Sequence, residues 1–203
     1  ATTAARVMPA EPLTPPPAEA RAPLQPALEA GLRWLALFQD DMDDVYGGLP
    51  VLEARLGARL SARNFVYLGA GYGWANGDLL NDDPTFEGLE SDLVVVPLEL
   101  GQRWDLAPRP DFRVNLGWRL ELAWVRETLP AGSGSAADQP LRESGWLRGF
   151  GVSVGPEWTL GHGRQAIGLE AGLVGSGGTV GGRYGRNTNL SGAWARVYLT
   201  ARL

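Results

Sequence analysis

The 203-residue sequence contains no cysteine and no lysine, and it contains a single histidine, His162. The absence of cysteine excludes a disulfide framework, a thiol nucleophile and a cysteine-ligated metal site. All 18 basic residues are arginine, and 23 acidic residues outnumber them, which gives a net charge of −5. An acidic chain without a basic stripe is not expected to bind nucleic acid.

The sequence also lacks any apolar run of 18 or more residues, and this absence excludes a transmembrane helix. Mean hydropathy is −0.12, a value typical of a protein in water. Mean hydropathy does not detect a transmembrane β-barrel, because only every second residue of its strands faces lipid.

The first 26 residues differ in composition from the rest of the chain. Residues 1–26 are rich in alanine and proline and include the run Pro15, Pro16 and Pro17. Proline lacks an amide donor and fixes φ, so this segment is not expected in a central strand or a long helix. We interpret residues 1–26 as an extended arm and residues 27–203 as one folded domain.

Residues of that domain alternate between apolar and small or polar side chains, most clearly from Phe112 to Trp124. Period two predicts a β-strand, since a helix would repeat its apolar residues at every third or fourth position. Twelve steps of roughly 3.3 Å, tilted by about 40°, rise about 30 Å, which is enough to cross the apolar part of a membrane. Eight segments share the pattern: 28–38, 50–62, 65–74, 92–106, 112–124, 146–160, 165–175 and 191–203.

The predicted connections alternate in length. Short turns are expected around Arg63, Arg109 and His162, and long loops over residues 39–48, 75–91, 127–145 and 176–189. With eight antiparallel strands, all long loops fall at one end, and all short turns and both termini fall at the other. Outer-membrane barrels have this arrangement, with short turns in the periplasm.

Alternation alone does not distinguish a lipid-facing barrel from a soluble barrel with an apolar interior. The polar face is rich in glycine and serine, including Gly69, Gly71 and Gly151, and a narrow eight-stranded lumen needs small residues beside large ones. Aromatic residues of the apolar face cluster near the strand ends, as expected for two membrane-interface girdles. The predicted girdle residues are Trp74, Trp104, Phe112, Trp124, Trp146 and Trp158.

With these features the chain resembles the small OmpA/OmpX-type outer-membrane barrels over residues 28–203. The resemblance lies in strand number, girdles and loop asymmetry, and not in a diagnostic motif. It implies an all-β fold, an eight-stranded antiparallel transmembrane β-barrel with a proline-rich N-terminal arm, in a bacterial outer membrane with both termini periplasmic.

Charged residues on the predicted inner face have nearly balanced signs. Buried charges must form pairs or lose their charge, so we expect an ion-pair network that fills the lumen. Its predicted members are Arg33, Arg55, Arg59, Glu99, Arg103, Arg113, Arg119, Glu121, Glu170 and Arg196, with Glu29, Glu53, Glu157 and Arg202 on the same face. A gated or selective pore is the functional alternative to this filled lumen.

Other candidate sites are weaker. Some barrels of this kind modify lipid A through a histidine near a serine and an acid, but His162 falls in a predicted periplasmic turn, away from the outer leaflet. Asp40–Asp44 and the acidic second loop lack EF-hand spacing, so we predict no metal site and no cofactor. Arg183 and Arg186 are candidates for contact with lipopolysaccharide phosphates.

These features favour a non-enzymatic outer-membrane barrel that acts as a structural anchor or interaction subunit. Its expected partners are outer-membrane lipids, lipopolysaccharide, and a periplasmic or outer-membrane protein that binds the arm or the outer loops. The main alternative is a small-solute channel or an apolar-ligand conduit of the OmpW type, and a lipid A-modifying enzyme is the third.

Overall fold

The computed structural model describes residues 24–38, 46–78, 90–106, 109, 111–129, 140–161, 163–180 and 186–203. The described residues are almost entirely β-strand. The strands are β1 (Gln25–Leu37), β2 (Leu49–Ser61), β3 (Asn64–Asp78), β4 (Glu90–Asp105), β5 (Phe112–Leu129), β6 (Leu141–Leu160), β7 (Gln165–Val180), β8 (Arg186–Thr188) and β9 (Gly192–Arg202). In this described part of the chain, no helix is long and apolar enough to cross a membrane.

Eight long strands form a closed antiparallel barrel. Each pairs with its neighbour in sequence from β1 to β7, and β9 lies between β7 and β1, which closes the barrel. The short strand β8 pairs only with the end of β7. A closed barrel leaves no unpaired edge among its long strands, so the backbone satisfies its own hydrogen bonds without water.

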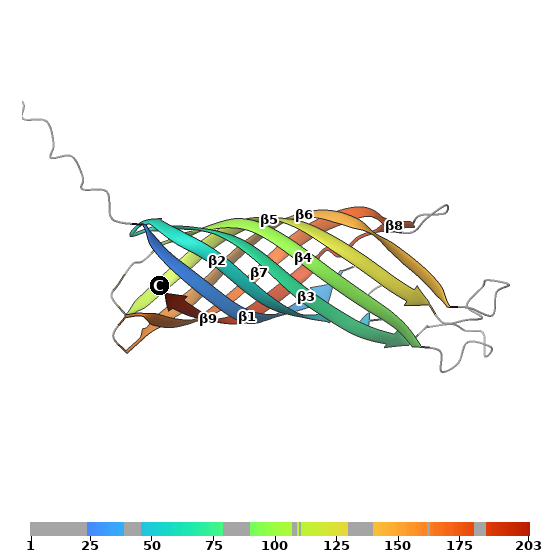
Figure 1. Cartoon of the computed structure of the whole chain (residues 1–203), viewed down its shortest axis with the longest axis horizontal. Helices are drawn as coiled ribbons and strands as arrows, with labels where there is room; N and C mark the ends of the chain where they lie inside the picture. The colour runs from blue at the N-terminus through green and yellow to red at the C-terminus, as the bar shows by residue number, and fades with distance from the viewer. Residues whose placement is uncertain are drawn as a thin grey trace, which may run out of the picture.

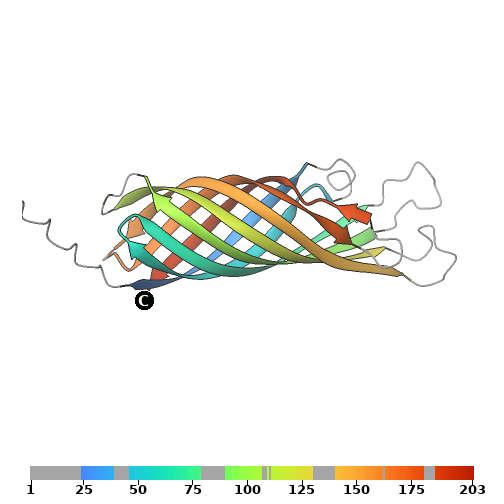
Figure 2. The ribbon, with the colours of Figure 1, turned by 90° about the horizontal axis from the view of Figure 1, so that it is seen from above.

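The strands run obliquely along one long axis (Figure 1). The connections β2–β3, β4–β5 and β6–β7 lie at one end, together with the start of β1 and the C-terminus, and we call this the turn end. At the other end, which we call the loop end, lie the strand ends that flank residues 39–45, 79–89, 130–139 and 181–185, and the view at right angles agrees (Figure 2). The predicted segregation of long and short connections is therefore present.

The turn between β6 and β7 shows why its sequence suits the turn end. Gly161 and Gly163 have φ of 52° and 84°, values that L side chains rarely adopt. The amide of Gly163 donates a hydrogen bond to the carbonyl of Leu160 at 3.2 Å, which closes the turn. Glycine at these two positions thus permits a short reversal.

Several strands extend beyond their predicted bounds at the loop end. β3 continues to Asp78, β5 continues to Leu129 and β6 begins at Leu141. Period two disappears from the sequence there because the hairpins project past the apolar belt, where no lipid requires alternate apolar side chains. At the turn end, β1 begins at Gln25, inside the range 1–26 that the sequence assigns to the arm. Proline is tolerated at Pro26 because it lies near the start of the strand.

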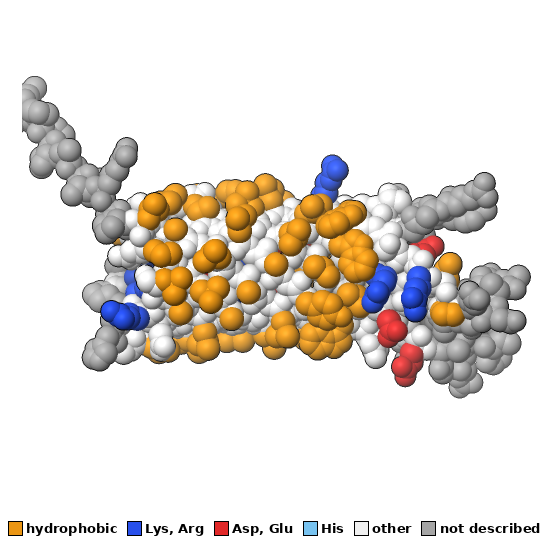
Figure 3. All heavy atoms as spheres, in the orientation of Figure 1, with side chains coloured by type: hydrophobic (Ala, Val, Ile, Leu, Met, Phe, Trp, Pro, Cys, Tyr) orange, Lys and Arg blue, Asp and Glu red, His pale blue; other side chains and the backbone are white. Residues whose placement is uncertain are grey.

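The outer wall of the barrel is an apolar belt. Leu28, Leu68 and Leu120 are 47%, 65% and 48% exposed, although each lies well inside its strand. On the face seen in Figure 3, hydrophobic side chains cover the body of the barrel, and most of the charged side chains lie toward its two ends. A continuous exposed apolar surface of this extent is unstable in water and is expected against lipid.

Candidate functional site in the barrel lumen

Every long strand turns alternate side chains into the lumen, and the inner face has two layers. Inward residues in the half toward the turn end are mostly charged, whereas inward residues toward the loop end are mostly apolar. The change occurs between consecutive inward positions, for example from Arg33 to Leu35 on β1 and from Glu53 to Val51 on β2. We call these the ionic layer and the apolar layer.

Arg33 is the inward residue of β1 at the border of the ionic layer with the apolar layer. Its guanidinium forms ion pairs with Glu53 at 2.8 Å, with Glu99 at 2.9 Å and with Glu121 at 2.9 Å. The side chain is only 2% exposed. These carboxylates come from β2, β4 and β5, so one arginine on β1 connects strands across the barrel.

Arg55 and Arg196 extend this network around the wall. Arg55 pairs with Glu99 at 3.0 Å and with Glu170 at 3.1 Å. Arg196 pairs with Glu53 at 3.0 Å, with Glu170 at 3.3 Å and with Glu29 at 3.4 Å. Because the carboxylates are shared, a single substitution leaves more than one arginine without a full set of partners.

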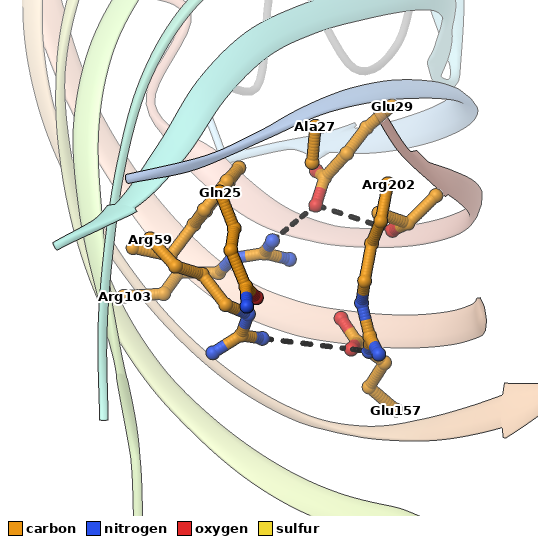
Figure 4. Close-up of a pocket in the computed structure, with 9 residues that line it drawn as sticks. Gln25, Ala27, Glu29, Arg59, Arg103, Glu157 and Arg202 are labelled. Atoms are coloured by element: carbon orange, nitrogen blue, oxygen red, sulfur yellow. Dashed lines mark hydrogen bonds and ion pairs between the residues drawn. The ribbon is translucent and has the colours of Figure 1, made fainter. Parts of the chain in front are cut away.

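The ionic layer closes the lumen near the turn end. Arg59 pairs with Asp105 at 2.7 Å, and Arg202 pairs with Glu157 at 3.5 Å. Arg103 forms an ion pair with Glu29, and Figure 4 shows that Arg59, Arg103, Glu29, Glu157 and Arg202 point toward one another. The pocket among them has a volume of about 10 Å³, which is room for about one water molecule.

Aromatic rings fill the space between the charges. The guanidinium of Arg55 lies 4.5 Å from the centre of the Tyr67 ring, and that of Arg196 lies 4.6 Å from Tyr198. Neither Gly101 nor Gly168 leaves room for a side chain, because a β-carbon there would overlap Tyr67 or Tyr198. Glycine on the inner face therefore makes room for a large ring on the adjacent strand, as expected in a narrow barrel.

The apolar layer corrects the prediction that the ion-pair network fills the lumen. The network occupies only the half toward the turn end, and hydrophobic side chains fill the other half because inward positions there carry leucine, valine and alanine. The apolar layer consists of Leu35, Leu37, Tyr46, Leu49, Val51, Ala75, Leu93, Val95, Ala123, Val125, Leu147, Val174, Val180, Leu190 and Trp194. The apolar layer could have been predicted from the sequence. Leu35 and Val95 are an even number of residues away from the charged inward residues of their strands and therefore face the lumen as well.

Arg119 lies where the two layers meet. Its Nε is 3.4 Å from Glu121, and its guanidinium lies 4.1 Å from the centre of the Trp194 ring. The Nη1 and Nη2 atoms of Arg119 and the Nε1 atom of Trp194 are buried without a hydrogen-bond partner among the described residues. The stacking contact provides part of the stabilisation that hydrogen bonds do not.

All ten predicted lumen residues form ion pairs with inward carboxylates or arginines. Asp105, Tyr67 and Tyr198 also lie in the ionic layer, but the sequence did not predict them as lumen residues. Asp105 is 4% exposed and pairs with Arg59 and Arg113. It stands at the end of β4, where the predicted strand and the following turn are hard to separate in the sequence.

The predicted girdle residues lie on the outer wall at the two predicted levels. Trp74 and Trp146 are 44% and 52% exposed toward the loop end, and Trp104 and Trp158 are 37% and 40% exposed toward the turn end. Trp124 pairs across strands with Trp146, and Phe112 with Trp158. Trp34 and Phe38, which the prediction left out, are also exposed on this wall.

Other sequence candidates lie outside the described residues. These are the proline run of the arm, His162, the Asp40–Asp44 cluster and Arg183, and the side chain of Arg186 is likewise not described. Within the described ranges, no group of three or more histidine, aspartate or glutamate residues is arranged to hold a metal ion.

No protein-family model matches the sequence, and no curated protein matches it. The structure is similar to that of Neisserial surface protein A, with 14% identity, 91% of this chain and 100% of that chain covered, and a TM-score of 0.53. A major outer membrane protein from Thermus thermophilus shares 13% identity over 90% of this chain and 100% of that chain, with a TM-score of 0.58.

The outer membrane protein AlkL, solved in lipid bilayers, is also similar, with 12% identity, 97% of both chains covered and a TM-score of 0.50. Similarity at these identities concerns the fold. The chain has the fold of the small outer-membrane β-barrels, in agreement with the OmpA/OmpX-type resemblance in the sequence.

Proposed function

We propose that this protein is a closed, non-conducting and non-enzymatic barrel of the bacterial outer membrane, which anchors its termini at the periplasmic face. The observation that carries the proposal is the filled lumen. The ionic layer and the apolar layer follow one another along the axis, and the residues of both are largely buried. Eight-stranded barrels are just wide enough for side chains to fill them in this way.

The proposed orientation places the turn end in the periplasm. Support comes from the short turns and from the start of β1 and the C-terminus, which lie together at that end. In outer-membrane barrels the short turns face the periplasm. The proline-rich arm that precedes β1 then extends into the periplasm, where a protein partner binds it.

A non-enzymatic role is supported by the state of the described carboxylates in the ionic layer. Glu53, Glu99 and Glu170 each face at least two arginines at ion-pair distance. The pocket beside the network is about 10 Å³ in volume, far too small for a substrate. Carboxylates held in this way stabilise the barrel rather than transfer protons to a bound molecule.

Planar-bilayer recording tests the closed lumen. The purified, refolded protein is inserted into a lipid bilayer in concentrated potassium chloride, with a large porin as the positive control. We expect no stepwise current from the wild-type protein, because both layers exclude a continuous water column. Reproducible single-channel steps from protein that shows the heat-dependent gel shift of a folded barrel would contradict the proposal and favour the channel alternative.

A further inference from the structure

Three arginines on the outer wall, near the loop end, differ from those of the lumen. Arg126 on β5 and Arg142 and Arg148 on β6 are exposed and point outward. Within the described part of the chain, none of them forms an ion pair, although Arg126 lies over the ring of Trp124 at 5.8 Å. We call these three residues the arginine cluster.

Arg148 lies on the membrane side of the girdle. Trp124 and Trp146 face each other across β5 and β6, and Arg148 is the next outward residue of β6 toward the turn end. Two residues along a strand tilted by about 40° correspond to about 5 Å of depth. A lone charge at that depth in an apolar wall is unfavourable unless a partner from the membrane neutralises it.

Arg126 and Arg142 lie on the other side of the same girdle. Arg126 pairs with Ser144 and Arg142 with Thr128, so the two arginines are diagonal neighbours on adjacent strands. Diagonal neighbours of this kind lie about 7–8 Å apart at the backbone. The arginine cluster therefore lies on both sides of the Trp124–Trp146 pair. Arg148 lies toward the turn end, and Arg126 and Arg142 lie toward the loop end.

An apolar groove of about 450 Å³ begins at Arg148 and continues over the outer wall. Arg148 pairs across strands with Leu122, which in turn pairs with Leu98. Leu100 and Leu120 also pair with each other and are the next outward residues of their strands toward the turn end. The inward residues Glu99 and Glu121 also border this groove, but their carboxylates pair with Arg33 in the lumen. The groove thus offers an apolar floor that leads away from a cation.

On the other side of Arg148, two outward residues of β7 are glycines. Gly177 on β7 pairs with Arg148, and Gly175 lies one outward step away. A β-carbon at either position would approach a single atom, at 4.0 Å, so the space above both glycines is open. Above these two glycines, a headgroup bound by Arg148 would meet the Ser191 hydroxyl and backbone rather than a large side chain.

A second groove on the wall provides a comparison within the same molecule. It measures about 480 Å³ and runs past Leu32, Trp34 and Val197. The charged residues that border it, Glu170 and Arg196, face the lumen and pair with each other. It has the apolar floor without an outward arginine, so it is suited to an acyl chain but not to a phosphate.

We propose that the arginine cluster and the groove below it bind a multiply phosphorylated, multiply acylated lipid of the outer leaflet. Arginine donates paired hydrogen bonds to phosphate oxygens, and the acyl chains lie over the leucines. More than one phosphate is expected because the cations lie on both sides of the girdle. Asp92, which is exposed on β4 beside Thr128, forms no ion pair with the three arginines and leaves their charge available. The inference rests on the membrane location proposed above, but not on a closed lumen.

The test measures lipid binding by the refolded full chain in a neutral detergent, with native mass spectrometry. The probes are bisphosphorylated lipid A, the same lipid after dephosphorylation, and phosphatidylglycerol. The variant Arg126→Gln/Arg142→Gln/Arg148→Gln is compared with Arg164→Gln, which removes an exposed arginine at the turn end.

We expect the wild-type protein and Arg164→Gln to bind bisphosphorylated lipid A at least about tenfold more tightly than the triple variant, given the strength of charged hydrogen bonds to phosphate. The heat-dependent gel shift shows that each variant has folded. Equal binding by the folded triple variant, or equal binding of dephosphorylated lipid A, would overturn the proposal. Phosphatidylglycerol binding as tight as that of lipid A would overturn the requirement for several phosphates.

Discussion

At the scale of single residues, the stability of the barrel depends on carboxylates that several arginines share. Glu99 is 5% exposed and lies within ion-pair distance of Arg33, Arg55 and Arg119. Removing one partner of a buried ion pair costs far more stability than replacing both partners by apolar residues. The remaining charge keeps its desolvation penalty and has lost its counter-charge. The stability of the folded barrel therefore depends on the whole set of partners around each buried charge.

Replacing Glu99 by glutamine should lower the free energy of unfolding by about 3–5 kcal/mol, because it leaves buried arginines without a counter-charge. The change keeps the size of the side chain, so packing is disturbed little. Urea unfolding in phospholipid vesicles, followed by tryptophan fluorescence, measures the effect. Asp92→Asn is the matched control, since Asp92 is exposed on the same strand, and its effect should stay within about 0.5 kcal/mol. Equal stability of the two variants would contradict the role assigned to the network.

At the scale of single strands, β5 crosses the full apolar thickness of the proposed membrane. Its outward residues begin with Phe112 at the turn-end girdle and reach Trp124 at the loop-end girdle, twelve residues later. That separation corresponds to about 30 Å of height at the usual tilt. Arg126 and Thr128 follow on the same face, so the apolar outward pattern ends where the girdle does. The strand thus marks both boundaries of the belt in its own sequence.

An arginine in the middle of that belt should destabilise the barrel in lipid. Leu120 lies between the girdles and is 48% exposed, so Leu120→Arg is expected to cost about 2–4 kcal/mol. Leu160, at the turn-end limit of β6, is 41% exposed, and Leu160→Arg should cost about 0–1 kcal/mol. Urea titration in vesicles compares the two variants. A cost at Leu160 as large as that at Leu120 would mean that the wall does not follow the depth of a membrane.

At the scale of the whole molecule, the barrel separates two sets of features. The turn end holds the ionic layer, the start of β1 and the C-terminus, and the loop end holds the apolar layer and the arginine cluster. A filled lumen separates the two ends, so each is free to serve a different partner. In the proposed orientation, lipid contacts belong to the outer face, and protein contacts made through the arm belong to the periplasm.

Deleting residues 1–23 should abolish co-purification of a periplasmic protein partner from native membranes and leave the barrel intact. The deletion stops before Gln25, where β1 begins, and therefore keeps the pairing of β1 with β9. A full-length chain in which Pro15, Pro16 and Pro17 are replaced by serine tests the proline run separately. Mass spectrometry identifies the proteins that are lost. An unchanged set of co-purified proteins from the truncated, folded barrel would refute the role of the arm.

The sequence by itself determined the strands, their inward and outward faces, the girdles and the segregation of short turns from long loops. It did so because a strand that crosses lipid must alternate its side chains, and aromatic residues such as Trp124 and Trp158 are expected at the limits of a lipid-facing wall. Only the tertiary structure decided which charges meet, since Arg33 on β1 pairs with carboxylates on strands far away in sequence. It also divided the lumen into two layers and placed Arg148 beside bare glycines and a leucine groove, because these neighbours are set by strand register around a closed barrel.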